Sequence, residues 1–397
     1  MTNHAAKRNS HDLICLSHLR WNFVFQRPQH LMTRFAKERR VFFFEEPIFD
    51  ASASELRITR DQGVYVCEPH LSGDLAHAAV AKELRRLLVE MQMKFAIDRP
   101  VLWFYTPMAL DFARDVTASA IVFDCMDELS AFHGASPDLL KHEAELLSRA
   151  DLVFTGGQSL YEAKRERHRR VYPFPSSVDV PHFSSARRAK RDPDDQRDLP
   201  HPRLGFFGVI DERMDLNLLD AVATARPDWH LVILGPCVKI DPATLPRHAN
   251  IHYLGMKKYD ELPAYLSGWD VALLPFARND STRFISPTKT PEYLAAGRPV
   301  VSTSVRDVVR PYGEQEFVEI ADHPDDFICA IQRALRQPSA DWRERVDRFL
   351  SGMSWDRTWS EMSALIDGVS SGASLAPVAG IVPGTADMVW SPAASSL

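Results

Sequence analysis

The chain alternates short apolar segments with amphipathic ones over most of its length. In the first 183 residues, the apolar runs are rich in Val, Ile and Phe and fall at 13–17, 40–45, 64–67, 101–105, 120–124 and 152–155. Strands buried on both faces of a parallel sheet have this pattern. Between these runs, apolar residues recur with helical spacing over 29–38, 75–97 and 137–150. The alternation predicts a doubly wound α/β domain.

A second series of the same kind begins at residue 203. Its expected strands are 204–207, 231–234, 251–253, 271–274 and 300–303, and its expected helices are 216–225, 259–267, 291–296 and 324–335. The stretch 184–202 has mixed charge and three prolines, which is typical of a linker. We therefore expect two domains facing a cleft, 1–183 and 203–340. A helix over 341–369 and a disordered tail over 370–397 follow them.

Composition narrows the function. The chain has 397 residues and a net charge of −6, which argues against a nucleic-acid binder because phosphate contacts need a basic surface. The cysteines are odd in number and contain no CxxC, which excludes a disulfide framework and a structural zinc site: Cys15, Cys67, Cys125, Cys237 and Cys329. No run approaches the ~20 apolar residues of a membrane span, and the first twelve residues lack the apolar core of a signal peptide. These features predict a cytoplasmic protein.

The loop after the strand 271–274 carries the most distinctive chemistry. Ser286, Thr288 and Lys289 stand at the expected start of a short helix, where free N–H groups and the helix dipole add to the ammonium charge. This predicts an anion site suited to a diphosphate. Glu292, one turn further on, could accept hydrogen bonds from the two hydroxyls of a ribose. A plainer alternative is a solvated lysine and a glutamate that offsets the dipole.

Several segments, in order along the chain, carry a family resemblance. Residues 292–300 read Glu-Tyr-Leu-Ala-Ala-Gly-Arg-Pro-Val, and similar but weaker matches lie at 150–155 with 178–183, at 203–208 and at 253–271. Together they resemble the glycosyltransferases of the GT-B fold over about residues 12–368. The resemblance implies two Rossmann-like domains, with the helix 341–369 returning to the first domain.

The resemblance also implies an activity. It is transfer of a hexose from a nucleotide sugar, with UDP the expected nucleotide, to the hydroxyl of a saccharide or lipid-linked acceptor. The second domain would hold the donor and the first the acceptor. Gly208 and Arg213 would meet the diphosphate with Lys289, Glu292 would bind the ribose, and the backbone near Lys258 and Tyr259 would meet the nucleobase.

No cofactor or metal is expected, because GT-B enzymes stabilise the diphosphate with protein cations. The only Asp-x-Asp stands at 192–194, in the expected linker. Retaining members of a large GT-B family carry a glutamate eight residues before the one that matches Glu292, and here that position is Phe284. The run 286–289 is closer to inverting glucuronosyltransferases of exopolysaccharide assembly, and residues 21–30 resemble transferases of teichuronic acid synthesis. We therefore expect inversion.

An inverting transfer needs a general base beside the acceptor hydroxyl. Asp127 is the first candidate because it follows the strand 120–124, and Asp124 and Glu128 are rivals. The alternative is that Asp127 caps the next turn.

The loop after the first strand supplies the candidates for acceptor binding, His18, Trp21 and Arg27. His18 is also a weaker candidate for the base. His30, on the following helix, is expected to be structural. An aromatic-rich loop often packs on its own domain, which is the alternative for Trp21.

Three alternatives stay open. The basic run 164–170 could dock on anionic lipid, although a solvated helix end explains it as well. A nucleotide-sugar epimerase shares the GT-B fold. A non-catalytic protein with two α/β lobes could bind the same ligand.

Overall fold

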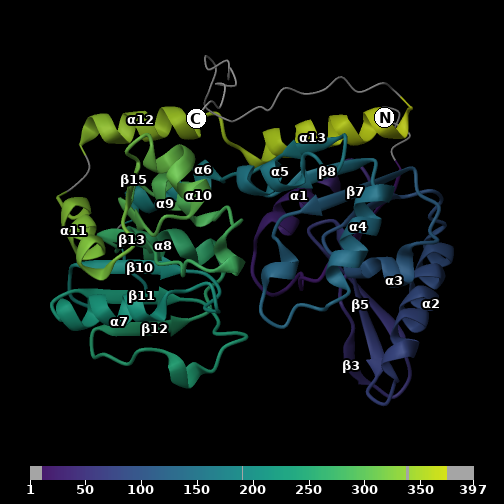
Figure 1. Cartoon of the computed structure of the whole chain (residues 1–397), viewed down its shortest axis with the longest axis horizontal. Coiled ribbons are helices and arrows are strands. Elements are labelled where there is room, and N and C mark those ends of the chain that lie inside the picture. The colour runs from purple at the N-terminus through teal and green to yellow at the C-terminus, as the bar shows by residue number, and fades with distance from the viewer. Residues whose placement is uncertain (1–10, 190, 337–338, 373–397) are drawn as a thin grey trace, which may run out of the picture.

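The computed structural model describes residues 11–189, 191–336 and 339–372. Two sheets with helices on both faces stand side by side, and the last helix spans back over the first domain (Figure 1). The first sheet has the order β3-β5-β2-β1-β6-β7-β8-β9, with β4 antiparallel to β5 and the other pairs parallel. Its strands are β1 (Leu13–Leu16), β2 (Val41–Phe44), β3 (Ile48–Ala51), β4 (Glu55–Asp61), β5 (Val64–Ser72), β6 (Val101–Phe104), β7 (Ala120–Cys125), β8 (Leu152–Thr155) and β9 (Val171–Pro173).

The second sheet is parallel, with the order β12-β11-β10-β13-β14-β15. Its strands are β10 (Arg203–Phe207), β11 (His230–Leu234), β12 (Ile251–Gly255), β13 (Val271–Leu274), β14 (Val300–Ser302) and β15 (Val318–Ile320). We call the units built on the two sheets the first and the second domain. This architecture confirms the predicted α/β class with two Rossmann-like halves.

The helices connect successive strands. Those before the second sheet are α1 (Arg27–Phe35), α2 (His77–Phe95), α3 (Leu110–Ala113), α4 (Leu139–Arg149), α5 (Gln158–Lys164) and α6 (Val180–Ser184). Those after its first strand are α7 (Leu216–Ala225), α8 (Leu262–Ser267), α9 (Lys289–Ala295), α10 (Arg306–Val308), α11 (Pro324–Ala334), α12 (Ala340–Leu350) and α13 (Trp355–Ser370). Short turns of tighter or wider helix lie at Pro107–Ala109, Leu129–Ala131, Ser185–Arg188, Pro242–Thr244, Tyr259–Glu261, Asp280–Thr282 and Val309–Gly313.

The strand order locates the site. In the first sheet, β1 lies between β2 and β6, so the chain leaves it in both directions. In the second sheet, β10 lies between β11 and β13 in the same way. Ligands of open α/β sheets bind beyond the carboxyl ends of the strands at such reversals. The loops after β1 and β10 are therefore the expected walls of a site.

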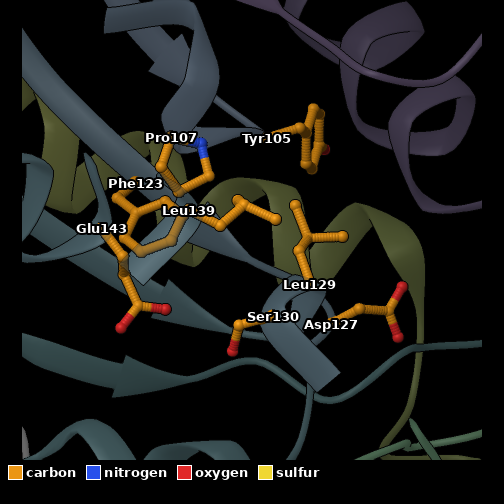
Figure 2. A pocket seen from close by; sticks show the side chains of 8 residues that line it. All are labelled: Tyr105, Pro107, Phe123, Asp127, Leu129, Ser130, Leu139 and Glu143. Carbon is orange, nitrogen blue, oxygen red and sulfur yellow. The ribbon is translucent and has the colours of Figure 1, made fainter. Parts of the chain in front are cut away.

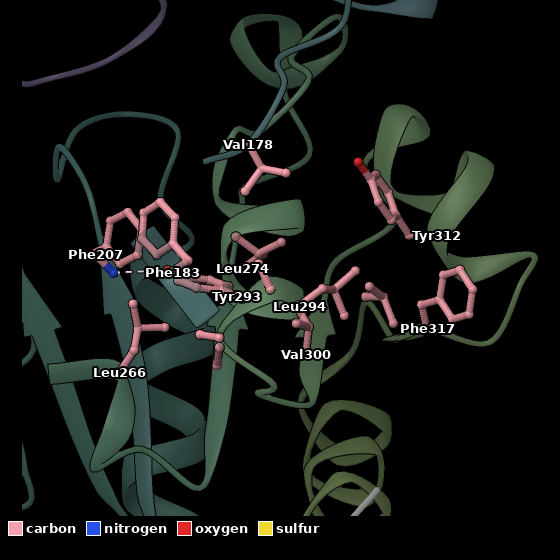
Figure 3. Packing of buried hydrophobic residues seen from close by; sticks show 14 of the residues in the cluster. Val178, Phe183, Phe207, Leu266, Leu274, Tyr293, Leu294, Val300, Tyr312 and Phe317 are labelled. Carbon is pink, nitrogen blue, oxygen red and sulfur yellow. Dashed lines mark hydrogen bonds between the residues drawn. The ribbon is translucent and has the colours of Figure 1, made fainter. Parts of the chain in front are cut away.

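The core of the second domain packs aromatic side chains around β10 (Figure 3). Tyr293 of α9 is fully buried, and its hydroxyl oxygen accepts a hydrogen bond of 3.0 Å from the backbone N–H of Phe207. Gly205 leaves room for Trp269, since a Cβ at this position would stand 1.8 Å from the indole ring. This packing fixes α9, and with it Lys289 and Glu292, against the end of β10.

The pattern did not reveal β3, β4, β9 or β15. Most residues of β4 are exposed, and β3 is only partly covered, so neither has the continuous apolar run of a central strand. The hairpin between β4 and β5 turns at Gln62 and Gly63, both with positive φ. β9 and β15 are each three residues long.

The C-terminal segment is two helices rather than the one expected over 341–369. Gly352 lies between them, and the hydroxyl of Ser354 caps α13 by accepting from the backbone N–H of Arg357. α12 packs on α9, whereas α13 packs on α1 of the first domain. There, Trp355 is buried and stacks on His30 with ring centroids 4.5 Å apart.

The segment 184–202 packs on the second domain. Gln196 is fully buried, accepts from the indole N–H of Trp269 at 2.9 Å, and donates to the Tyr265 carbonyl at 3.0 Å. Of the expected tail 370–397, residues 373–397 lie outside the described part of the chain.

Candidate active site

A cavity of about 700 Å³ lies between the two domains, at the point where both sheets reverse their strand order. The first domain contributes the loops after β1 and β7 to its wall. The second contributes the loops after β10, β11, β12 and β13 and the start of α9. Small-molecule sites commonly occupy roughly 300–1,000 Å³. The cavity is therefore large enough for a ligand of nucleotide-sugar size.

Two glycines bring the second-domain loops together. Gly208 follows β10 with a φ of +141°, and a Cβ there would stand 2.2 Å from Cε of Lys289. Gly235 follows β11 with a φ of +138°, and its Cβ would stand 1.9 Å from the carbonyl oxygen of Gly208. A larger residue at Gly235 would push the two loops apart, whereas one at Gly208 would displace the Lys289 side chain. The close approach leaves the Lys289 ammonium in the cavity wall.

Lys289 and Glu292 face the same cavity from successive turns of α9, and neither forms an ion pair with the residues that the structure describes. Burial raises the pKa of Glu292, and the Lys289 charge offsets this only in part. Burial and the nearby Arg213 lower the pKa of Lys289. Both side chains therefore lack the partners that buried charges normally have. A ligand with an anionic part and hydroxyl groups would supply them.

Arg213 adds a second cation. Asp211 accepts from its Nη2 at 2.7 Å and from its Nε at 3.0 Å, which fixes the guanidinium at the cavity wall. Its guanidinium carbon also lies 5.5 Å from the ring centroid of Phe132, in the first domain. Arg213 therefore contacts both sides of the cavity.

Asp127 is the acidic residue of the loop after β7 whose carboxylate has no hydrogen-bond partner among the described residues. It lines the large cavity and also a small pocket, in which Figure 2 shows it next to Leu129. Burial raises its pKa, and Arg213 and Lys289 across the cavity oppose that rise. The carboxylate of the first domain thus faces the two cations of the second.

The rivals of Asp127 are engaged elsewhere. Asp124 is fully buried and accepts two hydrogen bonds of 2.9 Å from Arg27. Glu128 pairs with Lys164 at 2.6 Å and accepts from the Ser130 hydroxyl at 2.8 Å. Neither carboxylate is free to take a proton from a ligand.

Three comparisons with known proteins agree with this geometry. Residues 201–337 match the family model described as Glycosyl transferases group 1. An Escherichia coli structure described as trehalose-6-phosphate bound with UDP-2-fluoro glucose superposes with a TM-score of 0.68 at 13% identity, covering 89% of this chain and 99% of that one. Sucrose-phosphate synthase from Thermosynechococcus elongatus also gives 0.68, at 15% identity over 91% and 100% of the two chains. The chain therefore has the GT-B fold, and its residues 201–337 match a group 1 glycosyltransferase domain.

Two further proteins are similar to this chain. The Anabaena protein Alr3699/HepE, solved with UDP and glucose, has a TM-score of 0.61 at 12% identity and covers 89% of this chain and 99% of its own. TuaH of Bacillus subtilis strain 168, named as a glycosyltransferase of teichuronic acid biosynthesis, is 27% identical over 263 residues. That match covers 60% of this chain and spans 64% of the length of TuaH.

The structure places the three residues expected to bind the acceptor in different roles. Arg27 is 1% exposed and gives three hydrogen bonds inside the first domain, two to Asp124 and one to the Phe174 carbonyl. The guanidinium is therefore held by the first domain, while Arg27 also lines the cavity, so its contact with the acceptor stays a prediction. Trp21 lines the GT-B cleft, but its indole N–H donates to Asp61 at 2.8 Å.

His18 lies beside the cleft rather than in the wall of the large cavity. Burial and the charge of Lys239 lower its pKa to about 4, so the imidazole is neutral at pH 7. Its Nδ1 is buried without a hydrogen-bond partner among the described residues. A ligand contact of His18 remains a prediction.

The loop after β12 lines the cavity, and its expected contact with the nucleobase stays a prediction. Lys258 is exposed at the cavity edge, and Ser286 and Thr288 line the wall beside Lys289. Tyr259 stacks on His182 with ring centroids 4.3 Å apart. The ring centroid of Phe25, in the first domain, lies 4.5 Å from that of Tyr259. Tyr259 is thus part of an aromatic contact between the domains as well as of the cavity wall.

Sequence reasoning missed Asp211, Asp61 and Phe132. Asp211 stands two residues before Arg213, and this spacing of opposite charges after a strand was a usable signal. Asp61 reaches Trp21 from the end of the β4–β5 hairpin, and Phe132 meets Arg213 across the cleft. No local sequence pattern indicates either contact. Phe284, at the position where retaining members of a large GT-B family carry a glutamate, packs on the core of the first domain.

Within the described ranges, no cluster of three or more His, Cys, Asp or Glu side chains has the geometry of a metal site. None of the described helices has the length and hydropathy needed to cross a bilayer. In the basic run 164–170, Lys164 is buried and pairs with Glu128 and Glu143, and Arg167 also pairs with Glu143. These two cations are therefore not available for docking on lipid.

Proposed function

We propose that this GT-B protein transfers a sugar from a nucleotide-sugar donor, with UDP the expected nucleotide, to a hydroxyl group of a saccharide or lipid-linked acceptor. The observation that carries the proposal is the unpaired carboxylate of Asp127, which faces the cations of Lys289 and Arg213 across the cavity. What the similar proteins are described as binding or making supports these substrates. One structure is bound with UDP-2-fluoro glucose, another with UDP and glucose, and TuaH is named for teichuronic acid biosynthesis.

In the proposed mechanism, Asp127 takes the proton of the acceptor hydroxyl as its oxygen attacks the anomeric carbon. The bond between that carbon and the diphosphate oxygen breaks, so the donor leaves as a nucleoside diphosphate. Lys289 and Arg213 stabilise the charge that develops on it. Glu292 accepts hydrogen bonds from the ribose. Attack from the face opposite the diphosphate inverts the anomeric configuration.

We propose that no metal is required, because the two cations lie where the diphosphate charge would develop. Calorimetry with nucleoside diphosphates and nucleotide sugars, with and without EDTA, tests both points. One nucleotide class should bind equally with and without EDTA. Lys289→Ala should lose this binding, whereas Lys258→Ala, at an exposed position of the same wall, should keep most of it.

No heat of binding with any nucleotide would overturn the proposal. Binding without release of nucleoside diphosphate, even with a panel of acceptors, would point to a ligand-binding protein instead. Turnover of the donor to an isomer of equal mass, with no acceptor present, would point to an epimerase.

A further inference from the structure

Helix α5 of the first domain meets the second domain at its N-terminal end. Asp307 of α10 accepts a hydrogen bond of 3.0 Å from the backbone N–H of Ser159, in the first turn of α5. Arg306 pairs with Glu162 at 2.5 Å, one turn further along. Asp307 is 6% exposed, so this contact is a buried part of the interface between the domains.

Gly157, just before α5, allows this close approach. A Cβ on Gly157 would stand 2.1 Å from Oδ2 of Asp307 and 2.7 Å from Cβ of Ser286. Ser286 belongs to the wall that also holds Lys289. The start of α5 therefore touches the second domain at two points, the Asp307 carboxylate and the loop that contains Ser286.

The C-terminal end of α5 reaches the other wall of the cavity. Lys164, the last residue of α5, is 3% exposed and pairs with Glu128 at 2.6 Å and with Glu143 at 2.8 Å. Glu128 directly follows Asp127. A second contact joins the same two segments, because a Cβ on Gly156 would stand 2.5 Å from the carbonyl oxygen of Met126. The loop with Asp127 is thus held at Met126 and at Glu128, on both sides of the carboxylate.

We propose that α5 couples docking of the second domain to the position of Asp127. Asp307 and Glu128 are positioning residues at its two ends: Asp307 fixes the helix when the domains meet, and Glu128 transmits that position to Asp127 through Lys164. The proposal rests on the proposed function, since it takes Asp127 as the base. A base displaced by about 1 Å can cost roughly 100-fold in rate, so a helix that sets its position controls turnover.

The first experiment measures docking. Cys329, the exposed thiol on α11, and an introduced Met93→Cys on α2 take spin labels, with Cys237→Ser to remove the other accessible thiol. Double electron–electron resonance, a pulsed electron paramagnetic resonance method, gives the distribution of distances between the two spin labels. It is measured on the full chain with saturating UDP. Asp307→Ala should broaden the distance distribution toward longer distances. Asp307→Asn keeps an acceptor for the Ser159 N–H and should therefore give a distribution close to that of wild type.

The second experiment separates an effect on the position of Asp127 from an effect on UDP binding. Glu128→Ala leaves Lys164 paired with Glu143, so no buried charge loses its partner. We expect it to keep the wild-type label distances and the wild-type Kd for UDP, but to lower kcat by about tenfold or more. Glu128→Gln should recover part of kcat. Glu314→Gln, in an exposed ion pair inside the second domain, is the matched control and should change neither quantity.

The failures are distinguishable. If wild-type protein binds no nucleotide, the proposed function falls. If it binds UDP and turns over, but Asp307→Ala and Glu128→Ala keep both the distances and kcat of wild type, the coupling is overturned and the proposed function stands. A loss of UDP affinity in Glu128→Ala with unchanged kcat would also overturn the coupling, because Glu128 would then act on binding.

Discussion

Asp127 combines two opposing influences on one carboxylate. Desolvation favours its neutral form, while Arg213 and Lys289 favour the charged form that a base requires. Desolvation is the larger influence, so the pKa of Asp127 lies above the ordinary value. At the residue scale, the acidic limit of activity should report this balance.

We expect kcat/KM to fall as pH falls through the raised pKa of Asp127, because the protonated carboxyl cannot accept the hydroxyl proton. Lys289→Met removes a charge that lowers this pKa, so the acidic limb of its residual activity should move to higher pH. Asp127→Asn should lower kcat by about 10²–10⁴-fold. The pH profiles of the three proteins are the measurement. A residual rate in Asp127→Asn with the wild-type acidic limb would show that another group is the base.

The same scale shows what the sequence can reveal about a site. Strand ends and charged positions indicated Asp127 and Lys289, the family resemblance indicated Arg213, and the structure brings all three to one cavity. Local sequence could not distinguish Asp127 from Asp124 and Glu128, because their partners come from remote segments. Arg27 precedes Asp124 by 97 residues, and Lys164 follows Glu128 by 36. Availability for chemistry depends on these pairings, which only the fold determines.

Among the elements, the buried parallel strands were predicted closely, since burial on both faces leaves an uninterrupted apolar run. The exposed strand β4 and the break between α12 and α13 were not, because solvent-facing positions tolerate many residue types. Burial also explains a glycine in a central strand. Gly205 of β10 is needed where Trp269 covers the strand, and this requirement is invisible without the packing.

Gly205→Ala should destabilise the second domain by about 1–3 kcal/mol, the usual cost of overpacking a core. The new methyl group would stand 1.8 Å from the Trp269 ring, so the indole must move and strain its hydrogen bond with Gln196. Urea denaturation followed by tryptophan fluorescence measures the change. Gly352→Ala meets only an ordinary contact at 3.8 Å and is the control. Equal stability of the two variants would contradict this account.

Helix α13 is the element that joins the end of the chain to its beginning. Trp355 is 1% exposed against α1, and truncating a buried tryptophan to alanine costs roughly 3–5 kcal/mol. Trp355→Ala should therefore lower the melting temperature of the first domain. Trp342→Ala, at a partly buried position on α12, should lower it less. Differential scanning calorimetry measures the melting temperatures of both variants. If Trp355→Ala lowers the melting temperature no more than Trp342→Ala does, the packing of α13 contributes little to the stability of the first domain.

At the scale of the whole molecule, the contact between Asp307 and α5 makes the domain arrangement depend on pH. Burial in the contact raises the pKa of Asp307 to about 6, whereas an exposed aspartate has 3.8. The other charged or titratable groups nearby are Arg306 on its own helix, Glu162 on α5, which pairs with Arg306, and Tyr312. Because the docked state binds a proton more tightly than a separated one, lower pH should favour docking.

The pKa values set the size of the effect. Docking should gain about tenfold between pH 7.5 and 5.0, and most of this gain should be lost as pH rises through 6. The distance between labels on Cys329 and Met93→Cys, measured without ligand at both pH values, tests this. Asp307→Asn cannot titrate at this position and should show no comparable change. The catalytic rate cannot serve as the readout, because protonation of Asp127, whose pKa is also raised, lowers the rate as pH falls. A wild-type distribution that widens at pH 5.0 would show that another group, rather than Asp307, sets the pH dependence of docking.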